Sequence, residues 1–496
     1  MHMLWTASRP RLLLVGLLAV LLCGSSAMAK SCRVAQNGVE AWVTRDDHRL
    51  RLAQQCVGRT DAREDAVSIE VDAQSRHQVM LGVGASLTDS SAWLIQHRLD
   101  IDKRDALLRE LFSSEDGLGL GLIRLTVGSS DFSRDHYSLN DLSVGEEDRQ
   151  QSRFSIDINR MDVIPVAREA LKINPTLQIM ASPWSPPGWM KTTGSLIGGT
   201  LREEHFDSFA AYFLSYLDAY AKEGIPIFAI TLQNEPSFEP TDYPGMRLSA
   251  AQRVRLIADH LGPALAARQS PTRIYEWDHN WDKPHEPLEV LADERARRHL
   301  AGVAWHCYDG DISAQSVVHD RYPEMDVLLT ECSGGDWEPV RSGGLAYQTS
   351  EIIINAARHW ASGMLFWNLA LDQDAGPFKG GCMTCRGVVT IDSVRRKFRR
   401  NDEYYALAHF SRFVARGAVR IGSSGSSDGV DNVAFLAPDG GSVILIASNR
   451  SRKARRLRIQ QGTLQFDHQV PKRSIVTYRW PLSGEASADS AAGDDR

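Results

Sequence analysis

The fold of this chain is decided by a pattern that is clearest at residues 204–235, which read EHFDSFAAYFLSYLDAYAKEGIPIFAITLQNE. In the first part, 204–222, apolar residues recur at three- and four-residue spacing, which is typical of an amphipathic helix. A short and almost continuous apolar run follows at 226–234, as expected for a strand that is buried on both faces. The segment therefore predicts a helix followed by a buried strand that ends in polar residues.

The same alternation extends in both directions, from about residue 78 to residue 370. A second helical stretch lies at 249–268. Seven further apolar runs resemble the one at 226–234: 78–86, 119–127, 177–183, 273–279, 302–308, 326–332 and 361–368. Eight buried strands, each followed by helical or loop material, indicate a parallel (β/α)8 barrel, the TIM-barrel class of α/β fold. An open doubly wound sheet is the alternative, but no glycine-rich dinucleotide fingerprint follows the first strand.

The two ends of the chain have a different pattern. Residues 30–75 and 405–481 hold short alternating segments separated by Gly, Ser, Asp and Asn, which predicts the strands of a β-sandwich. We expect both ends to build one all-β sandwich beside a barrel at 76–404. The tail at 482–496 is rich in Ala, Ser, Asp and Gly and is expected to be disordered.

The first 29 residues have the features of a secretory signal peptide. Arg9 and Arg11 precede an apolar run at 12–22, and the sequence Ala-Met-Ala at 27–29 fits a cleavage site. The apolar run is too short to span a bilayer. We therefore expect cleavage near Ala29 and a secreted or periplasmic protein without stable membrane insertion.

Six cysteines follow the expected signal, and an even number suggests disulfide bonds in an exported protein. Two local pairs are plausible: Cys32 with Cys56, and Cys382 with Cys385. The second pair also has the spacing of half a zinc site or of a redox motif, but no further pair of ligands lies near it, which favours a loop-closing disulfide. Cys307 and Cys332 lie inside expected strands and are interpreted as buried thiols.

The charge balance argues against some classes of partner. With 56 Lys and Arg against 62 Asp and Glu, the formal net charge is −6. This balance indicates neither a nucleic-acid partner nor an anionic membrane surface. The one basic cluster, at 450–458, lies between two strand-like runs and is interpreted as the solvated face of a strand.

Polar and aromatic residues gather where the expected barrel strands end, which is where such barrels place their active sites. They are Asp89, Arg124, Trp184, Asn234, Glu235, His306, Tyr308, Glu331 and Trp367. Tryptophan rings fit the apolar face of a sugar, and Asp and Asn side chains bind its hydroxyl groups. Glu235 and Glu331 end the fourth and seventh strands, so their carboxyl groups are expected to approach one site from opposite sides. Cleavage of a glycosidic bond requires such a pair.

These residues also have purely structural interpretations. A single Glu at a strand end is more often an ion-pair partner than a catalyst, and tryptophan packs well in cores. An Asn before Glu235, and a second Glu at the end of a later strand, favour catalysis. His306 is a conceivable metal ligand, but no set of His, Asp and Glu with ligand spacing accompanies it, which favours a hydrogen-bonding role. Pairing with Arg124 would hold a catalytic carboxylate ionised.

Seven segments carry a family resemblance: 82–89 (GVGASLTD), 123–133 (IRLTVGSSDFS), 181–191 (ASPWSPPGWMK), 233–237 (QNEPS), 329–332 (LTEC), 366–371 (FWNLAL) and 409–413 (HFSRF). They resemble the glycoside hydrolase family that contains acid β-glucosidase, the lysosomal glucosylceramidase, and that includes microbial β-1,6-glucanases. The resemblance covers nearly the whole chain after the signal. It implies a catalytic barrel with a sandwich built from both chain ends, and no metal or organic cofactor.

The resemblance also implies residue roles. Glu235 matches the general acid/base and Glu331 the nucleophile. Four residues match positions that hold the sugar: Asp89, Trp184, Asn234 and Trp367. Three match positions that support the two glutamates: Arg124, His306 and Tyr308.

Two loops depart from the lysosomal enzyme, at 237–246 and at 380–387, and the first is closer to microbial relatives. The sequence thus predicts a retaining β-glycosidase of the glucosylceramidase type, with a β-glucoside, either glycolipid or glucan, as its substrate. An endo-β-1,6-glucanase is the alternative among enzymes, and a non-catalytic carbohydrate-binding protein is the alternative from another class. A metal-dependent hydrolase is a third. The oligomeric state is left open.

Overall fold

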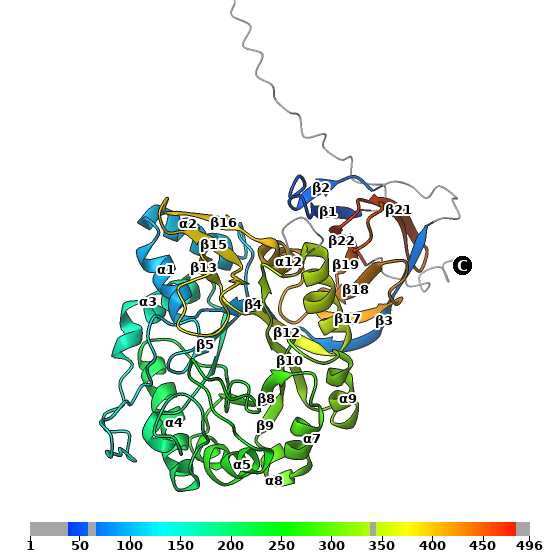
Figure 1. Cartoon of the computed structure of the whole chain (residues 1–496). Helices are drawn as coiled ribbons and strands as arrows, with labels where there is room; N and C mark the ends of the chain where they lie inside the picture. Colours follow the sequence, from blue (N-terminus) through cyan, green and yellow to red (C-terminus); the bar gives the residue numbers. More distant parts are fainter. Residues whose placement is uncertain (1–37, 58–65, 338–343, 483–496) are drawn as a thin grey trace, which may run out of the picture. The chain divides into compact units, whose positions relative to one another are not determined.

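The chain folds around a closed barrel of eight parallel strands (Figure 1). The structure is a computed structural model and describes residues 38–57, 66–337 and 344–482. The barrel strands are β4 (Gly82–Ser86), β5 (Leu122–Thr126), β6 (Gln178–Ser182), β7 (Ala229–Thr231), β8 (Arg273–Asn280), β9 (Leu300–His306), β10 (Asp326–Glu331) and β12 (Ala361–Phe366). They follow one another in chain order, and β12 pairs with β4 to close the barrel. The eight predicted strands and the TIM-barrel class are therefore confirmed.

The interior of the barrel has an apolar layer and then a polar one. Seven strands contribute one buried side chain each to an apolar cluster: Leu122, Met180, Ala229, Tyr275, Ala304, Leu328 and Leu365. Five of these strands have a buried polar or charged residue two positions further along: Arg124, Ser182, Thr231, His306 and Thr330. Side chains two positions apart on a strand share a face. The inward-facing layer nearer the C-terminal ends of the strands is therefore polar.

Helices pack around the barrel, and the longest of them, α4 (Phe206–Lys222), is the predicted helix at 204–222. Thr88 caps α1 by accepting a hydrogen bond from the backbone N–H of Ser91. Ser249 and Gln252 form a capping box at the start of α5. The other helices are α1 (Asp89–His97), α2 (Ile101–Phe112), α3 (Val163–Ile173), α5 (Ala250–Arg255), η4 (Leu256–Leu261), α6 (Gly262–Ala267), α7 (His285–Ala292), α8 (Glu294–Arg297), α9 (Ser313–Arg321), α10 (Gly344–Gln348), η5 (Thr349–Asn355), α11 (Ala356–Arg358) and α12 (Asp402–Ser411), with short 3-10 turns η1 (Asp157–Met161), η2 (Gly188–Met190) and η3 (Glu203–His205).

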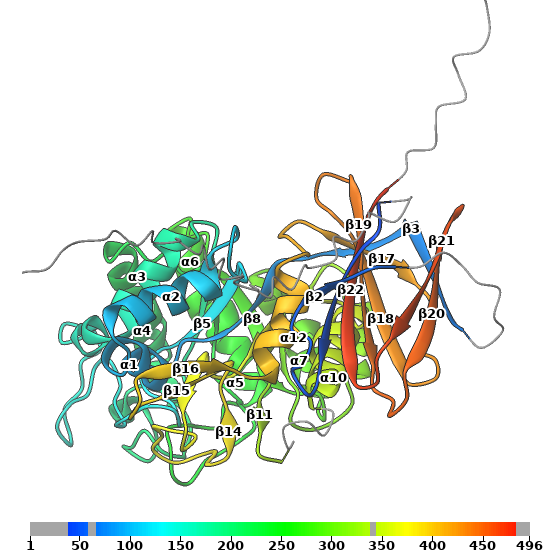
Figure 2. The same cartoon turned by 90° about the horizontal axis from the view of Figure 1, so that it is seen from above.

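Strands from both chain ends form one nine-stranded sheet, in the order β2-β1-β22-β19-β18-β17-β3-β20-β21 (Figure 2). Their bounds are β1 (Glu40–Arg45), β2 (Ala53–Gln55), β3 (Val67–Val79), β17 (Val419–Ser423), β18 (Val430–Leu436), β19 (Ser442–Asn449), β20 (Arg455–Gln461), β21 (Leu464–Val470) and β22 (Ser474–Pro481). β1 pairs with β22, so that Ala41 lies opposite Tyr478. Val43, Leu445 and Trp480 lie in the hydrophobic core of this sheet. The predicted sandwich of both chain ends is confirmed.

Two small sheets lie in the loops after the barrel strands. One joins β11 (Gly334–Gly335) to β14 (Cys385–Arg386), and the other joins β13 (Ala370–Asp372), β15 (Val389–Asp392) and β16 (Lys397–Arg400). The first predicted strand is shorter than expected, because residues 78 and 79 end β3 and the barrel strand starts at Gly82. Gly84 is required in this strand, since a Cβ atom there would lie 1.6 Å from the carbonyl oxygen of Leu122.

The cysteine predictions have mixed outcomes. Cys382 and Cys385 form the expected disulfide. The interpretation of Cys307 and Cys332 as buried thiols is wrong, because they form a disulfide just after the ends of β9 and β10. Cys32, the predicted signal peptide and nearly all of the predicted tail lie outside the described residues.

Within the described ranges, no helix is long and apolar enough to cross a membrane.

Candidate active site

A cavity of about 380 Å³ lies at the C-terminal ends of the barrel strands. Its lining residues are Asp131, Trp184, Asn234, Glu235, Phe238, Tyr243, His279, Asn280, Tyr308, Glu331, Trp337, Trp367, Gly381, Cys382 and Cys385. Six of the nine predicted site residues are among them. Two more, Arg124 and His306, are fully buried and contact the two glutamates.

Asp89 is the predicted site residue that the structure does not bring to the cavity. It opens α1, and its carboxylate accepts from Nε of Arg134 at 2.9 Å and from the backbone N–H of the same residue at 3.2 Å. Asp131, in the loop after β5, lines the cavity instead. It is 8% exposed, and its Oδ1 has no hydrogen-bond partner among the described residues. Burial and the charge of Glu331 raise the pKa of Asp131 well above its usual value.

The two glutamates meet in the cavity from opposite strands of the barrel. Glu331 is the last residue of β10, and Glu235 lies in the loop after β7. One carboxylate oxygen of each, together with a ring nitrogen of His306, lie within 4.8 Å of one another. Glu235 has a backbone φ of 51°, and its N–H donates to the carbonyl of Asp278 at 3.0 Å. This unusual backbone conformation is fixed by the neighbouring strand and directs the side chain into the cavity.

Asp278 lies at the centre of the polar layer and was not predicted as a site residue. A bulge in β8 between Trp277 and His279 turns its fully buried carboxylate into the barrel. That carboxylate accepts from five side chains: Arg124 Nη2 at 2.8 Å, Ser182 Oγ at 2.6 Å, Thr231 Oγ1 at 2.7 Å, His306 Nε2 at 3.1 Å and Thr330 Oγ1 at 2.6 Å. Burial would raise the pKa of Asp278, but Arg124 and His306 hold it well below its usual value. Asp278 is thus a fixed negative charge beneath the two glutamates.

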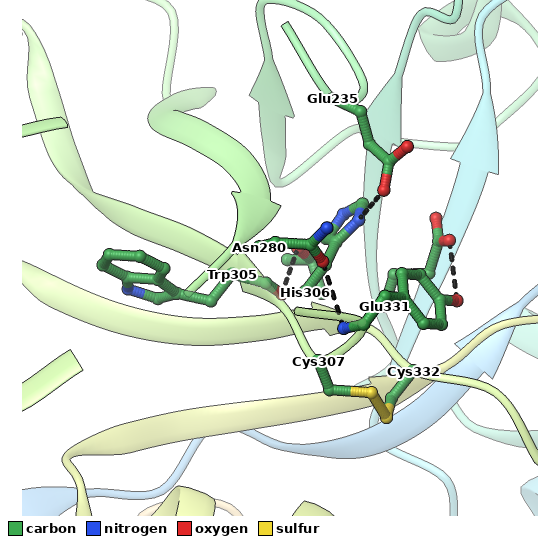
Figure 3. The surroundings of a disulfide bond; sticks show 9 residues. Glu235, Asn280, Trp305, His306, Cys307, Glu331 and Cys332 are labelled. Carbon is green, nitrogen blue, oxygen red and sulfur yellow. Dashed lines mark hydrogen bonds and ion pairs between the residues drawn. A yellow bond between two sulfur atoms is a disulfide. The ribbon is translucent and has the colours of Figure 1, made fainter. Parts of the chain in front are cut away.

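His306 links Asp278 to Glu235, and Figure 3 shows its contact with Glu235. Its Nδ1 lies 3.0 Å from Oε1 of Glu235, and its Nε2 lies 3.1 Å from Oδ1 of Asp278. Burial would lower the pKa of His306, but the charge of Glu331 and the hydrogen bonds to both carboxylates raise it to about 9. Both ring nitrogens therefore carry protons at neutral pH and donate to carboxylates.

Glu235, His306 and Glu331 are also the one set of residues, within the described ranges, whose spacing would suit a metal ion. A metal ligand must offer a free nitrogen lone pair, and a doubly protonated imidazole has none. The predicted hydrogen-bonding role of His306 is therefore the better interpretation.

Glu331 has two fixed hydrogen-bond donors. Nη1 of Arg124 donates to its Oε2 at 2.6 Å, and the phenol of Tyr308 donates to its Oε1 at 2.9 Å. Burial and the like charge of Glu235 raise the pKa of Glu331, while the charges of His306 and Arg124 oppose this rise. Burial would also raise the pKa of Glu235, but the hydrogen bond from His306 lowers it. The two carboxyl groups therefore titrate as a pair, in which Arg124 and Tyr308 favour the ionised form of Glu331.

The remaining predicted residues form one wall of the cavity. The rings of Trp184 and Trp367 stack at 5.0 Å between centroids, and the guanidinium of Arg124 lies 4.8 Å from the ring of Trp184. Oδ1 of Asn234 accepts from Nη2 of Arg124 at 2.8 Å. Because Arg124 only donates, this contact fixes the orientation of the amide and leaves its nitrogen as a donor for a ligand. The wall therefore offers aromatic rings and one oriented amide.

The two loops that depart from the lysosomal enzyme also reach the cavity. Phe238 and Tyr243 come from the first loop, and the disulfide of Cys382 with Cys385 comes from the second. The loops contact each other, because the N–H of Gly381 donates to the carboxylate of Asp242 at 3.2 Å. These two loops thus form part of the cavity rim.

Both parts of the fold match known proteins. The family model described as the glycosyl hydrolase family 30 TIM-barrel domain matches residues 80–414, and the model of the family 30 β-sandwich domain matches residues 417–478. The endo-1,6-β-D-glucanase of Neurospora crassa is 31% identical over 433 residues, which are 84% of this chain and 88% of that protein. The lysosomal acid glucosylceramidase of Mus musculus is 31% identical over 464 residues, which are 88% of each chain.

Solved structures show the same two-part fold. An endo-β1,6-glucanase superposes with a TM-score of 0.82 at 30% identity and covers 90% of this chain and 99% of its own. The SrfJ protein of Salmonella typhimurium superposes with a TM-score of 0.84 at 28% identity, with 90% of this chain and 100% of that chain covered.

Proposed function

The chain belongs to glycoside hydrolase family 30, and we propose that it is a retaining enzyme that cleaves β-glucosidic bonds by double displacement. One observation carries this proposal: carboxylate oxygens of Glu235 and Glu331 lie within 4.8 Å of each other. Retaining glycosidases hold their two carboxyl groups about 5 Å apart, whereas inverting enzymes leave more room for a water molecule.

Glu331 is the proposed nucleophile. It attacks the anomeric carbon of the sugar and forms a covalent glycosyl-enzyme. The donors Arg124 and Tyr308, at 2.6 Å and 2.9 Å, support this role because they favour the ionised form of the carboxylate and fix its orientation. The fixed negative charge of Asp278 in turn holds Arg124 in place.

Glu235 is the proposed general acid/base. It gives its proton to the leaving oxygen in the first step and takes a proton from water in the second. His306 supports this cycle because its positive charge lies 3.0 Å from Oε1 of Glu235 and stabilises the carboxylate that forms after proton transfer.

The sugar that is attacked would lie against Trp184 and Trp367. The rings offer an apolar surface to one face of the sugar. The oriented amide nitrogen of Asn234 is placed to donate to a ring hydroxyl, and Asp131 lines the same cavity. We assign the 2-hydroxyl to Asn234, since that contact strengthens in the transition state of glycosidases.

For the substrate, we propose a β-1,6-linked glucan that is cut within the chain. The endo-1,6-β-glucanases of Neurospora crassa, Aspergillus fumigatus and Trichoderma harzianum are 31–32% identical over 83–84% of this chain. The half-exposed side chains of Phe238 and Trp337 support a polymeric substrate, because they extend the aromatic lining to the rim of the cavity.

Glucosylceramide is the second candidate substrate. It is supported by the 31% identity with the mouse lysosomal acid glucosylceramidase. We also propose that the enzyme is exported after cleavage near Ala29. The two described disulfides, Cys307–Cys332 and Cys382–Cys385, fit an oxidising compartment.

Product analysis tests the proposal. The purified protein is incubated with β-1,6-glucan, with glucosylceramide in detergent and with an aryl β-glucoside. Early release of oligosaccharides from the glucan is expected, together with loss of all turnover in the variant Glu331→Gln. The matched control is Glu324→Gln, the same change at an exposed position seven residues earlier, which should keep full activity.

Each other outcome has a definite meaning. Release of glucose from glucosylceramide alone would favour the second candidate. Binding of glucan without any turnover would favour the carbohydrate-binding alternative, and activity of Glu331→Gln within tenfold of the unaltered enzyme would contradict the nucleophile assignment.

A further inference from the structure

The disulfide between Cys307 and Cys332 lies next to Glu331 and to His306, and His306 contacts Glu235 (Figure 3). Cys307 follows His306 at the end of β9, and Cys332 follows Glu331 at the end of β10. The two Cα atoms are 5.4 Å apart. His306 and Glu331 point into the barrel, so the cysteines that follow them lie on the outer side of its wall, where they pack against the surrounding hydrophobic core.

The backbone pairing of these two strands is irregular at this point. Leu329 lies opposite Trp305, but Glu331 lies opposite His306, so Thr330 is an extra residue in β10. Such a bulge disrupts the ladder of backbone hydrogen bonds. The pair of Glu331 with His306 is also the last one in the ladder. The disulfide comes one residue later and joins the strand ends covalently where the backbone pairing ends.

The disulfide also fixes Tyr308, the next residue after Cys307. The phenol of Tyr308 donates to Oε1 of Glu331 at 2.9 Å, and its backbone N–H donates to Oδ1 of Asn280 at 3.0 Å. Its side chain is 44% exposed, so packing restrains it little. The distance between the phenol and the carboxylate therefore depends on how firmly Cys307 is held to Cys332.

We propose that the Cys307–Cys332 disulfide is a positioning element for the Glu331 carboxylate, so that the oxidised enzyme is the fast form and the reduced enzyme a slow one. This inference rests on the proposed role of Glu331 as nucleophile. A dithiol reductant supplies two electrons and two protons: the S–S bond breaks, two thiols form, and the reductant becomes a cyclic disulfide. The barrel strands keep their other backbone pairs, so the fold is retained.

The test compares oxidised and dithiothreitol-reduced full-length enzyme on an aryl β-glucoside or on β-1,6-glucan. Reduction should lower kcat by about 10- to 100-fold, because a displacement of about 1 Å at a reacting group has effects of this size. KM should change by less than about twofold. The acid limb of the pH–rate profile should move to higher pH, because loss of the Tyr308 donor raises the pKa of the Glu331 carboxyl. Reoxidation should restore all three quantities.

Three variants assign the effect. Cys307→Ser/Cys332→Ser should reproduce the reduced enzyme and show no further response to dithiothreitol. Cys382→Ser/Cys385→Ser removes the other described disulfide, and its kcat should respond to reduction by the same factor as the unaltered enzyme. In Tyr308→Phe the response to reduction should be smaller, because the contact that the disulfide maintains is already absent.

A reduced enzyme with kcat within twofold of the oxidised one would overturn the inference. So would a loss of activity that reoxidation does not reverse and that accompanies loss of the circular dichroism signal, since the disulfide would then act on stability alone. If the oxidised enzyme hydrolyses no glucoside or glucan at all, the proposed function fails and this inference fails with it. Turnover without any dependence on redox state refutes the disulfide role alone.

Discussion

Asp278→Asn is the substitution that perturbs the site most with the smallest change in shape. The carboxylate is fully buried and is the acceptor for five side chains. An asparagine keeps one acceptor oxygen and replaces the other with a donor. If the side-chain oxygen of the asparagine faces Arg124, its amide nitrogen faces His306. Both Arg124 and His306 then lose the negative charge of Asp278.

The size of the effect follows from these contacts. Removing one partner of a buried charge network costs about 3–5 kcal/mol of stability, because the other charge remains buried without compensation. Asp278 is also one of the groups that hold the pKa of His306 at about 9. In the variant, the pKa of His306 should fall, and kcat should fall with it because the cation beside Glu235 is lost.

Urea unfolding followed by tryptophan fluorescence measures the stability, and the pH–rate profile reports the titration of the site. The matched control is Asp282→Asn, the same change at an exposed position four residues later, which should cost less than about 0.5 kcal/mol. If Asp278→Asn costs no more than about 1 kcal/mol beyond this control and keeps the pH profile of the unaltered enzyme, the central role of Asp278 is refuted.

Three further predictions concern single side chains. His306→Asn removes a positive charge shared by the two glutamates, so their pKa values rise and the acid limb of kcat/KM moves to higher pH; an unmoved limb would show that His306 is neutral. Trp184→Ala removes the ring stacked on Trp367, which should raise KM for a glucoside about tenfold with a smaller change in kcat; an unchanged KM would argue against a sugar-binding wall. The ammonium group of the buried Lys191 donates to three oxygens: Ser185 Oγ at 3.0 Å, the Leu196 carbonyl at 2.7 Å and the Gly245 carbonyl at 2.8 Å. Burial lowers the pKa of Lys191 from 10.5 to about 7. Between these two pKa values, Lys191 is protonated in the unfolded chain but not in the folded one. The free energy of unfolding of the unaltered enzyme, relative to that of Lys191→Met, should therefore rise from pH 7 to 10. A difference that stays constant over this pH range would contradict this.

Much of the architecture could be predicted because barrel strands and helices leave different periods in the sequence. The apolar run at 226–234 and the helix before it gave β7 and α4 directly. The positions of Glu235 and Glu331 followed from the rule that barrel strands end at the active site. That their side chains approach each other in one cavity could be predicted without knowledge of side-chain contacts, because the two strands are the fourth and seventh of eight.

Other features depend on irregularities that a regular period does not reveal. Strict alternation from the inward-facing Tyr275 would point Asp278 outward, but the bulge between Trp277 and His279 turns it inward. The bulge in β10 likewise sets the register that places Cys332 beside Cys307. No local pattern in the sequence marks either bulge.

The position of Asp89 depends on a different feature. The family resemblance implied that this residue holds the sugar. In the structure this residue opens α1, where a negative charge is favoured, and pairs with Arg134. Asp131 lines the cavity because the loop after β5 places it there, and the sugar-binding role of Asp89 stays a prediction.

The stereochemistry of the first product tests the central claim most directly. Hydrolysis of an aryl β-glucoside or of β-1,6-glucan by the purified enzyme can be followed by ¹H NMR before the released sugar mutarotates. Double displacement through Glu331 predicts that the β-anomer appears first. Initial release of the α-anomer would contradict a covalent intermediate on Glu331 and with it the proposed mechanism.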